Sequence, residues 1–324
     1  MADTVAVVIA AGLGSRLQPY TDNLPKCMLD VQGSTMLDRA LNTFTNLGVP
    51  RSVIIGGYKA DRLRFHGHCE LVMNHDYEKN NILHSLAHAR EQMNGADTAL
   101  ISYSDIIFRR SVVETLMADL GADISIVVDQ EWTDRYAGRM LHPLSQAEAA
   151  RFGGQQELLQ TGKDLLTEDH DSDNWGEFIG MMKMTPQGRE QFWGVFDDVN
   201  SRLDPDAPFQ DAPEWRRAYI TDLLQEMVDR EHARRAKQRA SGSSSSGGSS
   251  TRRKSKLQAV VGGGGGQRQS ERSRRRSAPS VPKQRRSGRR GSTHSMPGAL
   301  SVAGGPKMGK GEGEGEGADG LRRT

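Results

Sequence analysis

The sequence predicts an α/β fold over residues 1 to about 235, with a mostly parallel central sheet flanked by helices. Short apolar runs alternate with segments of helical periodicity up to about residue 128. Such alternation implies right-handed βαβ units and a sheet that is covered on both faces. The composition then changes near residue 240 to Gly, Ser and Arg, so we expect residues 241–324 to form a disordered tail.

The expected strands are short apolar runs, rich in β-branched residues, that glycine or polar residues bound. The first run, 5–11, is continuously apolar, which is typical of a parallel strand buried on both faces. By the same pattern, further strands are expected at 52–55, 70–73, 98–103, 123–128 and 177–182. After Asp129 the rhythm breaks, and we interpret the polar residues 130–175 as an insertion over the mouth of the sheet.

The expected helices carry apolar side chains at a spacing of three and four residues. The first, 34–47, also has both end signals, because Ser34 and Thr35 can cap its start and Gly48 can end it. By the same periodicity, further helices are expected at 80–93, 111–120, 186–199 and 214–231.

Charge separates the two parts of the chain. Residues 241–324 hold 18 Lys and Arg against 5 Asp and Glu, a net charge of +13, and residues 1–240 hold 25 against 36, a net charge of −11. The basic tail can make ionic, sequence-blind contact with nucleic acid. It has no aromatic residue within 252–290 for stacking on bases, so a solvated tail remains the simpler interpretation.

Cysteine use and the lack of targeting signals point to the cell interior. Cys27 and Cys69 show no metal-binding spacing, and we expect both to be reduced thiols. The first residues lack a basic signal region, and no stretch reaches the roughly 18 apolar residues of a membrane-spanning helix. We therefore expect a soluble, cytoplasmic protein with no membrane partner.

Three polar features follow expected strands, at the edge of an open α/β sheet where ligands bind. In the first, Gly12 and Gly14 allow backbone N–H groups to approach a phosphate, and Arg16 and Lys26 add positive charge. A plain tight turn also fits the Gly-x-Gly pattern. Arg16, Pro25 and Lys26 shift the balance toward a phosphate site, although the segment is neither a Walker A loop nor a full dinucleotide fingerprint.

The other two features are an acidic residue and an amide-rich helix start. Asp105 follows the strand at 98–103, where one carboxylate suits Mg²⁺ shared with substrate phosphates, although a turn or cap aspartate fits as well. Asn81 and Ser85 lie at the start of the helix at 80–93, where they can read a base edge or serve in ordinary N-capping.

Together these residues resemble a known family. The segments 10–17 and 25–29 are similar to the signature of sugar-phosphate and choline-phosphate nucleotidyltransferases. Further matches follow in the expected order at Gly57-Tyr58, 80–86, Ser104-Asp105 and 176–180. The pattern, which spans about 5–230, is closest to cytidylyltransferases for choline phosphate and for phosphonates. The resemblance implies a Rossmann-like nucleotidyltransferase fold.

The resemblance also implies a reaction and the residues that carry it out. CMP would pass from CTP to a small phosphate or phosphonate, of the phosphocholine or aminoethylphosphonate type, with Mg²⁺ as cofactor and pyrophosphate as the second product. Arg16 would stabilise the leaving pyrophosphate, Lys26 the α-phosphate, and Asp105 would hold Mg²⁺. The remaining nucleotide contacts would come from Ala11, Gly12, Gly14, Ser15, Asn81 and Ser85. The acceptor pocket would include Tyr136, Arg139 and Glu177.

The chain departs from the family pattern after about residue 236. Relatives continue with a further strand and a second Mg²⁺-binding Asp, where this chain runs into Ser, Gly and Arg repeats, and Asp222 on the preceding helix is a poor substitute. We therefore expect one metal ligand and one strand to be missing, and hypothesise a truncated or frameshifted version of a longer enzyme. Two alternatives stay open: a sugar-1-phosphate nucleotidyltransferase that uses UTP or another NTP, and a catalytically impaired nucleotide-binding relative.

Overall fold

The structure is a computed structural model that describes residues 3–136, 138–165, 174–240 and 257–261. The chain divides into two units, 1–268 and 269–324, and every described residue belongs to the first. None of the helices within the described residues combines the length and the apolar character needed to span a lipid bilayer.

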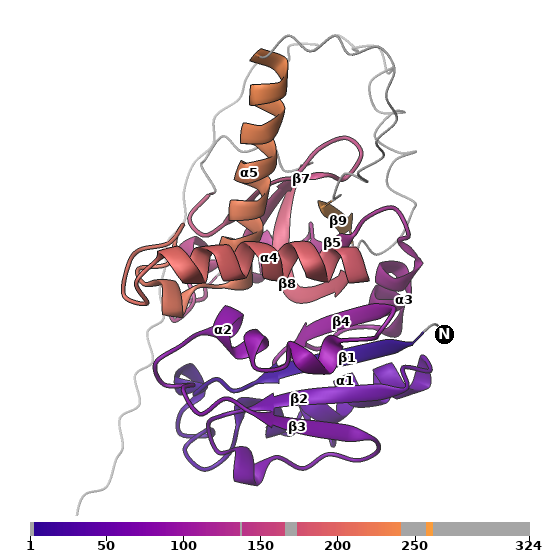
Figure 1. The fold of residues 1–324 in the computed structure, drawn as a ribbon. Coiled ribbons are helices and arrows are strands. Elements are labelled where there is room, and N and C mark those ends of the chain that lie inside the picture. The colour runs from indigo at the N-terminus through magenta and orange to yellow at the C-terminus, as the bar shows by residue number, and fades with distance from the viewer. Residues whose placement is uncertain (1–2, 137, 166–173, 241–256, 262–324) are drawn as a thin grey trace, which may run out of the picture. The chain divides into compact units, whose positions relative to one another are not determined.

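One nine-stranded sheet forms the centre of the described part of the chain, and helices pack on both of its faces (Figure 1). The strands are β1 (Thr4–Ala10), β2 (Arg51–Gly56), β3 (Cys69–Met73), β4 (Thr98–Tyr103), β5 (Ile124–Asp129), β6 (Ala149–Phe152), β7 (Leu158–Gly162), β8 (Trp175–Met184) and β9 (Leu257–Val261). The α-helices are α1 (Met36–Asn46), α2 (Ile82–Ala87), α3 (Arg110–Ala118), α4 (Pro186–Arg202) and α5 (Ile220–Ala240).

The strand order is β3-β2-β1-β4-β8-β5-β9, and β6 pairs with both β7 and β8. The pairs β2–β3, β1–β2, β1–β4 and β5–β9 are parallel, whereas β8 runs antiparallel to β4 and β5. The expected mostly parallel sheet is thus confirmed. Because β8 is reversed, its first residues lie beside the last residues of β5, with Glu177 opposite Asp129.

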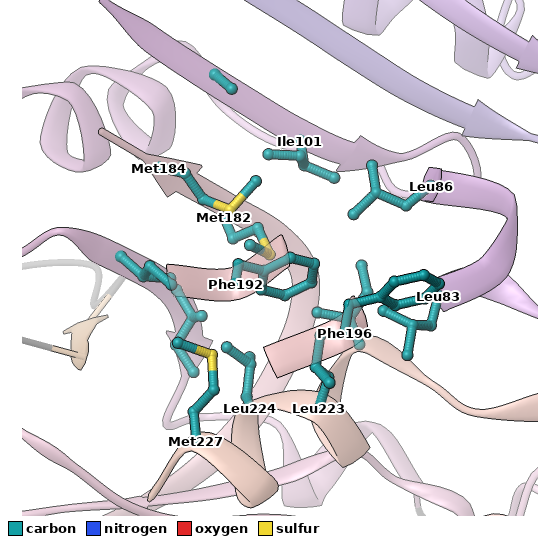
Figure 2. Close-up of a cluster of buried hydrophobic side chains, with 14 of the residues drawn as sticks. Leu83, Leu86, Ile101, Met182, Met184, Phe192, Phe196, Leu223, Leu224 and Met227 are labelled. Atoms are coloured by element: carbon teal, nitrogen blue, oxygen red, sulfur yellow. The ribbon is translucent and has the colours of Figure 1, made fainter. Parts of the chain in front are cut away.

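Two hydrophobic cores lie on opposite faces of the sheet, as the period of two in a strand requires. In β1, Val7 packs in the core with α2, α4 and α5, and the adjacent Val8 packs in the core with α1 and α3. Figure 2 shows the first core, where Phe192 and Phe196 of α4 lie between side chains of α2, α5 and β8. Every residue of β1 is buried, in agreement with its apolar run.

Threonine side chains cap the N-terminal ends of α1 and α4. Thr35 caps α1 by accepting a hydrogen bond from the Asp38 N–H at 3.0 Å, so the expected cap is confirmed. Thr185 caps α4 in the same way, accepting from the Gly188 N–H at 3.1 Å, with Pro186 at the first helical position. These caps satisfy backbone donors that the helices leave unpaired.

Two expected helices are each divided in the structure. The helix expected over 80–93 is α2 followed by a 3-10 turn at Glu91–Met93, because backbone bonds from the His88 N–H onward reach back three residues instead of four. The helix expected over 214–231 is a 3-10 turn at Trp215–Arg217 followed by α5. Asp222 marks the division, since its carboxylate accepts from the Tyr219 N–H at 2.6 Å.

Two expectations about irregular segments are wrong. The insertion expected over 130–175 contains the hairpin β6–β7, which extends the sheet through β8. The expected tail is structured at Leu257–Val261, because β9 pairs in parallel with β5, and Ala259 and Val260 are buried on opposite faces. A strand therefore does follow α5, where the sequence led us to expect one to be missing. Residues 241–256 and 262–324, where the rest of that tail was expected, lie outside the described residues.

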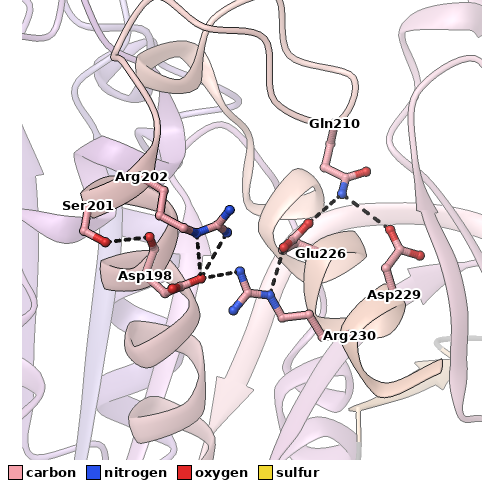
Figure 3. A network of polar contacts seen from close by, with 7 residues as sticks. All are labelled: Asp198, Ser201, Arg202, Gln210, Glu226, Asp229 and Arg230. Atoms are coloured by element: carbon pink, nitrogen blue, oxygen red, sulfur yellow. Dashed lines mark hydrogen bonds and ion pairs between the residues drawn. The ribbon is translucent and has the colours of Figure 1, made fainter. Parts of the chain in front are cut away.

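A polar network joins the surfaces of α4 and α5 (Figure 3). Asp198 of α4 accepts from Arg202 on its own helix at 3.0 Å and from Arg230 of α5 at 2.6 Å. Arg230 also donates to Glu226 at 2.8 Å. The network therefore connects the two helices outside the apolar core that Figure 2 shows.

Candidate active site

The loop after β1 folds back on itself at Gly14. Gly14 adopts φ 66°, a left-handed conformation that favours glycine. A Cβ there would also lie 3.2 Å from the side chains of both Lys26 and Thr21. The Thr21 hydroxyl donates to the Gly14 carbonyl oxygen at 2.9 Å. The turn therefore brings Lys26 close to the glycine segment.

Tyr58, just after β2, holds both ends of this loop. Its N–H donates to the Ala11 carbonyl at 3.1 Å, and its hydroxyl donates to the carbonyls of Thr21 at 2.9 Å and Asp22 at 3.0 Å. These bonds come from a neighbouring strand end, so the loop is held in shape by the sheet. The sequence signal for this role was the Gly57-Tyr58 pair.

The glycine segment offers unpaired backbone donors. Gly12 and Ser15 are exposed, and no atom lies within 4 Å of the position where a Cβ on Gly12 would be. Within the described part of the chain, the N–H groups of Gly12, Gly14 and Ser15 have no hydrogen-bond acceptor. Successive free N–H groups form an anion-binding concavity. The segment can therefore receive a phosphate.

Lys26 and Asp105 form an ion pair across the ends of two adjacent strands. The Lys26 Nζ lies 2.5 Å from the Asp105 Oδ2, and the two side chains are 29% and 33% exposed. Lys26 begins a 3-10 turn (Lys26–Met28) that the loop after β1 leads into, and Asp105 follows β4. Two residues predicted from separate motifs thus meet. Their partial exposure allows either partner to be exchanged for a ligand.

Asp105 is a single carboxylate beside the glycine segment. Among the residues that the structure describes, no group of three or more His, Cys, Asp or Glu side chains is placed to hold a metal ion. Mg²⁺ typically binds through one or two carboxylates, with waters and substrate phosphates as its other ligands. Asp105 can supply one such carboxylate, and a metal ion there stays a prediction.

Asn81 and Ser85 are engaged with other parts of the protein. The Asn81 side chain does not cap α2, and its amide donates to the Arg217 carbonyl at 3.1 Å. Ser85 is buried, and its hydroxyl accepts from the Asn74 amide at 2.9 Å. Contact of either residue with a base or ribose stays a prediction.

Tyr136, Arg139 and Glu177 lie together near the end of β5, where Glu177 of β8 is opposite Asp129. The Tyr136 hydroxyl donates to the Glu177 Oε1, and the Arg139 guanidinium lies 4.6 Å from the centre of the Tyr136 ring. Burial raises the pKa of the Glu177 carboxyl. The three residues predicted for the acceptor pocket are thus brought together, while their contact with an acceptor stays a prediction.

Glu148 is a candidate that the sequence did not indicate. It directly precedes β6, and its two oxygens accept from the Thr221 hydroxyl at 3.0 Å and from the Tyr103 hydroxyl at 3.2 Å. Burial raises the pKa of Glu148 to about 7, and the Lys163 charge opposes that rise. A glycine makes this packing possible: Gly180, at φ 81°, lies against the Tyr103 ring, where a Cβ would come within 2.2 Å of a ring carbon.

Positive charge gathers around His142, another residue that the sequence did not indicate. Its Nδ1 lies 2.6 Å from the Arg16 Nη1. Burial lowers the pKa of His142, and the nearby charges of Arg16, Arg139, Lys163 and Lys26 lower it further. Arg16 contacts the ring directly, and the other three cations are near enough to act on its charge. The four cations come from the loop after β1, the segment before His142 and the end of β7, so an anion at this edge would be attracted from several sides.

Cys27 takes no part in nucleophilic chemistry at neutral pH. It is buried beside the loop, and burial raises the pKa of its thiol to about 12. Neither Cys27 nor Cys69 forms a disulfide in the structure, and their reduced state stays a prediction.

Comparison with known proteins gives matches that agree with this geometry. A profile of the MobA-like NTP transferase domain matches residues 6–172. The CTP:phosphoglutamine cytidylyltransferase of Campylobacter jejuni is 26% identical over 69% of this chain and 88% of that enzyme. The 2-aminoethylphosphonate cytidylyltransferase of Lancefieldella rimae is 36% identical over 24% of this chain, and the match spans only 34% of that enzyme.

Among solved structures, the inositol-1-phosphate CTP transferase from T. maritima superimposes with a TM-score of 0.54 at 16% identity. The match covers 81% of this chain and 86% of that one. At this identity the likeness concerns the fold alone, and it agrees with the Rossmann-like nucleotidyltransferase fold expected from the sequence.

Proposed function

Because the chain belongs to the family of MobA-like NTP transferase domains, we propose that it transfers CMP from CTP to a small phosphate or phosphonate. The observation that carries the proposal is the loop after β1. Free N–H groups of Gly12, Gly14 and Ser15 lie beside the paired side chains of Lys26 and Asp105. The choice of CTP and of a small anionic acceptor is supported by the relatives, which are named for those substrates.

In the proposed reaction, an oxygen of the acceptor phosphate or phosphonate attacks the α-phosphorus of CTP. A new P–O bond forms, the bond between the α-phosphorus and the bridging oxygen of the β-phosphate breaks, and pyrophosphate leaves with the electron pair. Catalysis of this kind consists mainly of positioning and charge stabilisation. The protein therefore has to hold two anions close together.

Each group near the loop has a role in this proposal. The N–H groups of the glycine segment would bind phosphate oxygens, Arg16 would stabilise the leaving pyrophosphate, and Lys26 would neutralise the α-phosphate. Asp105 would hold Mg²⁺ jointly with the nucleotide phosphates, and this ion would supply further neutralisation of charge there. Lys26 can exchange Asp105 for a phosphate when the nucleotide arrives, since their pair is partly exposed.

The acceptor would bind beside Tyr136, Arg139 and Glu177. The Arg139 guanidinium has no carboxylate partner within ion-pair distance among the described residues, so it is available to an acceptor phosphate. The Tyr136 hydroxyl is fixed by its bond to Glu177. An acceptor held there would lie at the same sheet edge as the nucleotide loop.

The test is acceptor-dependent release of pyrophosphate by the purified chain. Each NTP is supplied in turn with phosphocholine, aminoethylphosphonate and sugar-1-phosphates, with Mg²⁺ or with a chelator. We expect release with CTP and one of the small phosphates, and its loss in the chelator. Release with UTP and a sugar-1-phosphate would show the other transferase class. No release from folded protein would indicate an impaired nucleotide-binding relative, as the expected loss of the second Asp predicts.

A further inference from the structure

His142 lies in a segment that has few other attachments to the body of the fold. The neighbouring side chains of Met140 and Leu141 are 91% and 75% exposed, so they contribute almost nothing to a core. The His142 ring lies 5.6 Å from the centre of the Tyr136 ring, and its Nδ1 contacts Arg16 at 2.6 Å. His142 therefore connects the acceptor side of the sheet edge to the nucleotide loop.

The contact with Arg16 fixes the protonation of the imidazole ring. An arginine side chain can only donate hydrogen bonds, so the Nδ1 of His142 must accept. The ring is then neutral, with its proton on Nε2. The charged groups that face it are Arg16 and Lys26 from the nucleotide loop, Arg139 from its own segment, and Lys163 from the end of β7. All four oppose a second proton.

Arg16 has no other anchor in the described part of the chain. No carboxylate lies within ion-pair distance of its guanidinium, and the Nδ1 of His142 is the acceptor that it contacts. An exposed arginine without a partner samples many rotamers, and ordering it on binding a ligand lowers the affinity. A single bond to one Nη leaves the remaining N–H donors of the guanidinium plane available to phosphate oxygens.

We propose that His142 is a positioning residue that holds the Arg16 guanidinium ready for the triphosphate of the nucleotide. The inference rests on the proposed function and adds a residue to it. His142 itself touches Arg16 and not the reacting atoms. Its removal should therefore weaken nucleotide binding. Once the triphosphate is bound, its oxygens hold Arg16 in the parent and in the variant alike, so the chemical step and the acceptor should be largely unaffected.

Three substitutions of His142 distinguish this role from simple packing. His142→Ala removes the acceptor atom. His142→Asn keeps an oxygen close to the position of Nδ1, whereas His142→Gln places its amide near Nε2 and leaves Arg16 without a partner. Exposed His68, in the turn before β3, supplies the control His68→Ala.

The measurement is the affinity for CTP with no acceptor present, followed by steady-state kinetics with the acceptor. We expect His142→Ala and His142→Gln to raise Kd and KM for CTP by about five- to tenfold, the cost of ordering one long side chain. The kcat and the KM for the acceptor should stay within about twofold. His142→Asn and His68→Ala should bind CTP like the parent protein.

Acid pH supplies a second readout that packing alone would not give. A second proton on His142 would occupy Nδ1, which removes the acceptor and places a cation beside Arg16. The lowered pKa of His142 confines this change to below about pH 6.5. As the pH falls through that range, the parent protein should lose CTP affinity relative to His142→Asn, in which nothing at this position titrates.

The ¹⁵N NMR spectrum of the His142 ring tests the pairing without any nucleotide. We expect an unprotonated Nδ1 at pH 7.5, and a rise in the pKa of His142 in Arg16→Ala. A protonated Nδ1, or equal CTP binding by the parent and His142→Ala, would overturn the inference alone. A parent protein that binds no nucleotide at all would overturn the proposed function and the inference together.

Discussion

The two sides of the candidate site handle charge in opposite ways. On the nucleotide side, Lys26 pairs with Asp105, both about one-third exposed, and backbone bonds from Tyr58 hold the loop. On the acceptor side, Glu148 and Glu177 are partly buried, burial raises the pKa of each, and tyrosine or threonine hydroxyls donate to them. The nucleotide side thus presents charges that a ligand can take over, and the acceptor side encloses charges whose ionisation is costly.

This difference indicates where pH should act. Burial raises the pKa of Glu148, on the acceptor side, to about 7 and that of Asp222, at the start of α5, to about 6, so we expect both carboxyls to exchange protons close to neutral pH. The predictions below test the comparison, beginning with the side on which a single charge should matter most.

The largest effect is expected from Lys26→Ala. Loss of one well-placed charge in a transfer reaction typically lowers kcat by about 10²- to 10³-fold. Stability should change little, because the Lys26–Asp105 pair is partly exposed. The measurement is pyrophosphate release at saturating CTP. Lys79→Ala, which removes an exposed lysine paired with Asp76 at 3.6 Å, is the matched control and should keep full activity. Equal rates of pyrophosphate release for Lys26→Ala and Lys79→Ala would contradict a role for the Lys26 charge in the reaction.

The next effect concerns stability against pH. A carboxyl whose pKa is higher in the folded than in the unfolded protein stabilises the fold fully below the unfolded pKa, and this contribution is lost as the pH rises through the folded pKa. For Glu148 the window is about pH 4.5 to 7, and the loss is about 2–3 kcal/mol. Denaturant unfolding at pH 5 and pH 8 measures it.

Glu148→Gln, which is neutral at every pH, supplies the comparison. We expect this variant to be more stable than the parent at pH 8 and to lose that advantage toward pH 5. The residual pH dependence should combine Asp222 and Glu177, whose pKa values burial also raises, with His84, His88 and His142, whose lowered pKa values act in the opposite direction. A stability difference between Glu148→Gln and the parent that is the same at pH 5 and pH 8 would contradict the view that the acceptor side encloses costly charge.

A smaller effect is expected from Val260→Ala. Val260 is buried in β9, which pairs with β5, and the last residue of β5 lies opposite Glu177. Removing two carbon atoms should lower the free energy of unfolding by about 1.5 kcal/mol. We expect a larger rise in the KM for the acceptor than in the KM for CTP, since β9 supports the acceptor side. No loss of stability would contradict the placement of β9 in the sheet.

The smallest effect is expected from Asp198→Asn, in the network of Figure 3. Hydrogen bonds from Arg230 and then Arg202 lower the pKa of Asp198, so its contribution is present above the unfolded pKa and is lost as the pH falls below about 4. The thermal midpoint should fall slightly at low salt and match the parent at high salt. Neither KM should change, and a change in either would show that α4 and α5 communicate with the site.

The meeting of Lys26 and Asp105 beside the glycine loop was predictable because its signals are local. A glycine loop after β1 and an aspartate after β4 are each visible in a short window, and parallel neighbours bring the ends of β1 and β4 together. The acceptor side depends on long-range pairing. Glu177 reaches the same edge only because β8 is reversed, and Glu148 reaches it only because β6 pairs with β8.

Some missed elements did leave signals in the sequence. Gly153-Gly154 separates two short runs with strand character, which is a hairpin signal that the polar surroundings hid. Leu257–Val261 is an apolar run inside a basic, glycine-rich region, and its composition hid a strand. His142 and Lys163 carry no motif of their own, because their role depends on the residues that the fold brings beside them.

The parallel pairing of β9 with β5 has a consequence for biosynthesis. During translation, β5 is synthesised long before Leu257. The edge of β5 that pairs with β9 therefore stays unpaired until that later segment has been made. The entropic cost of closing a loop grows only slowly with its length, so the length of the connection does not prevent β9 from pairing with β5. In the interval, however, the nascent chain exposes unpaired backbone groups along β5, which is the kind of edge that other strands join. Chains released before residue 257 should therefore self-associate more readily than chains that include β9.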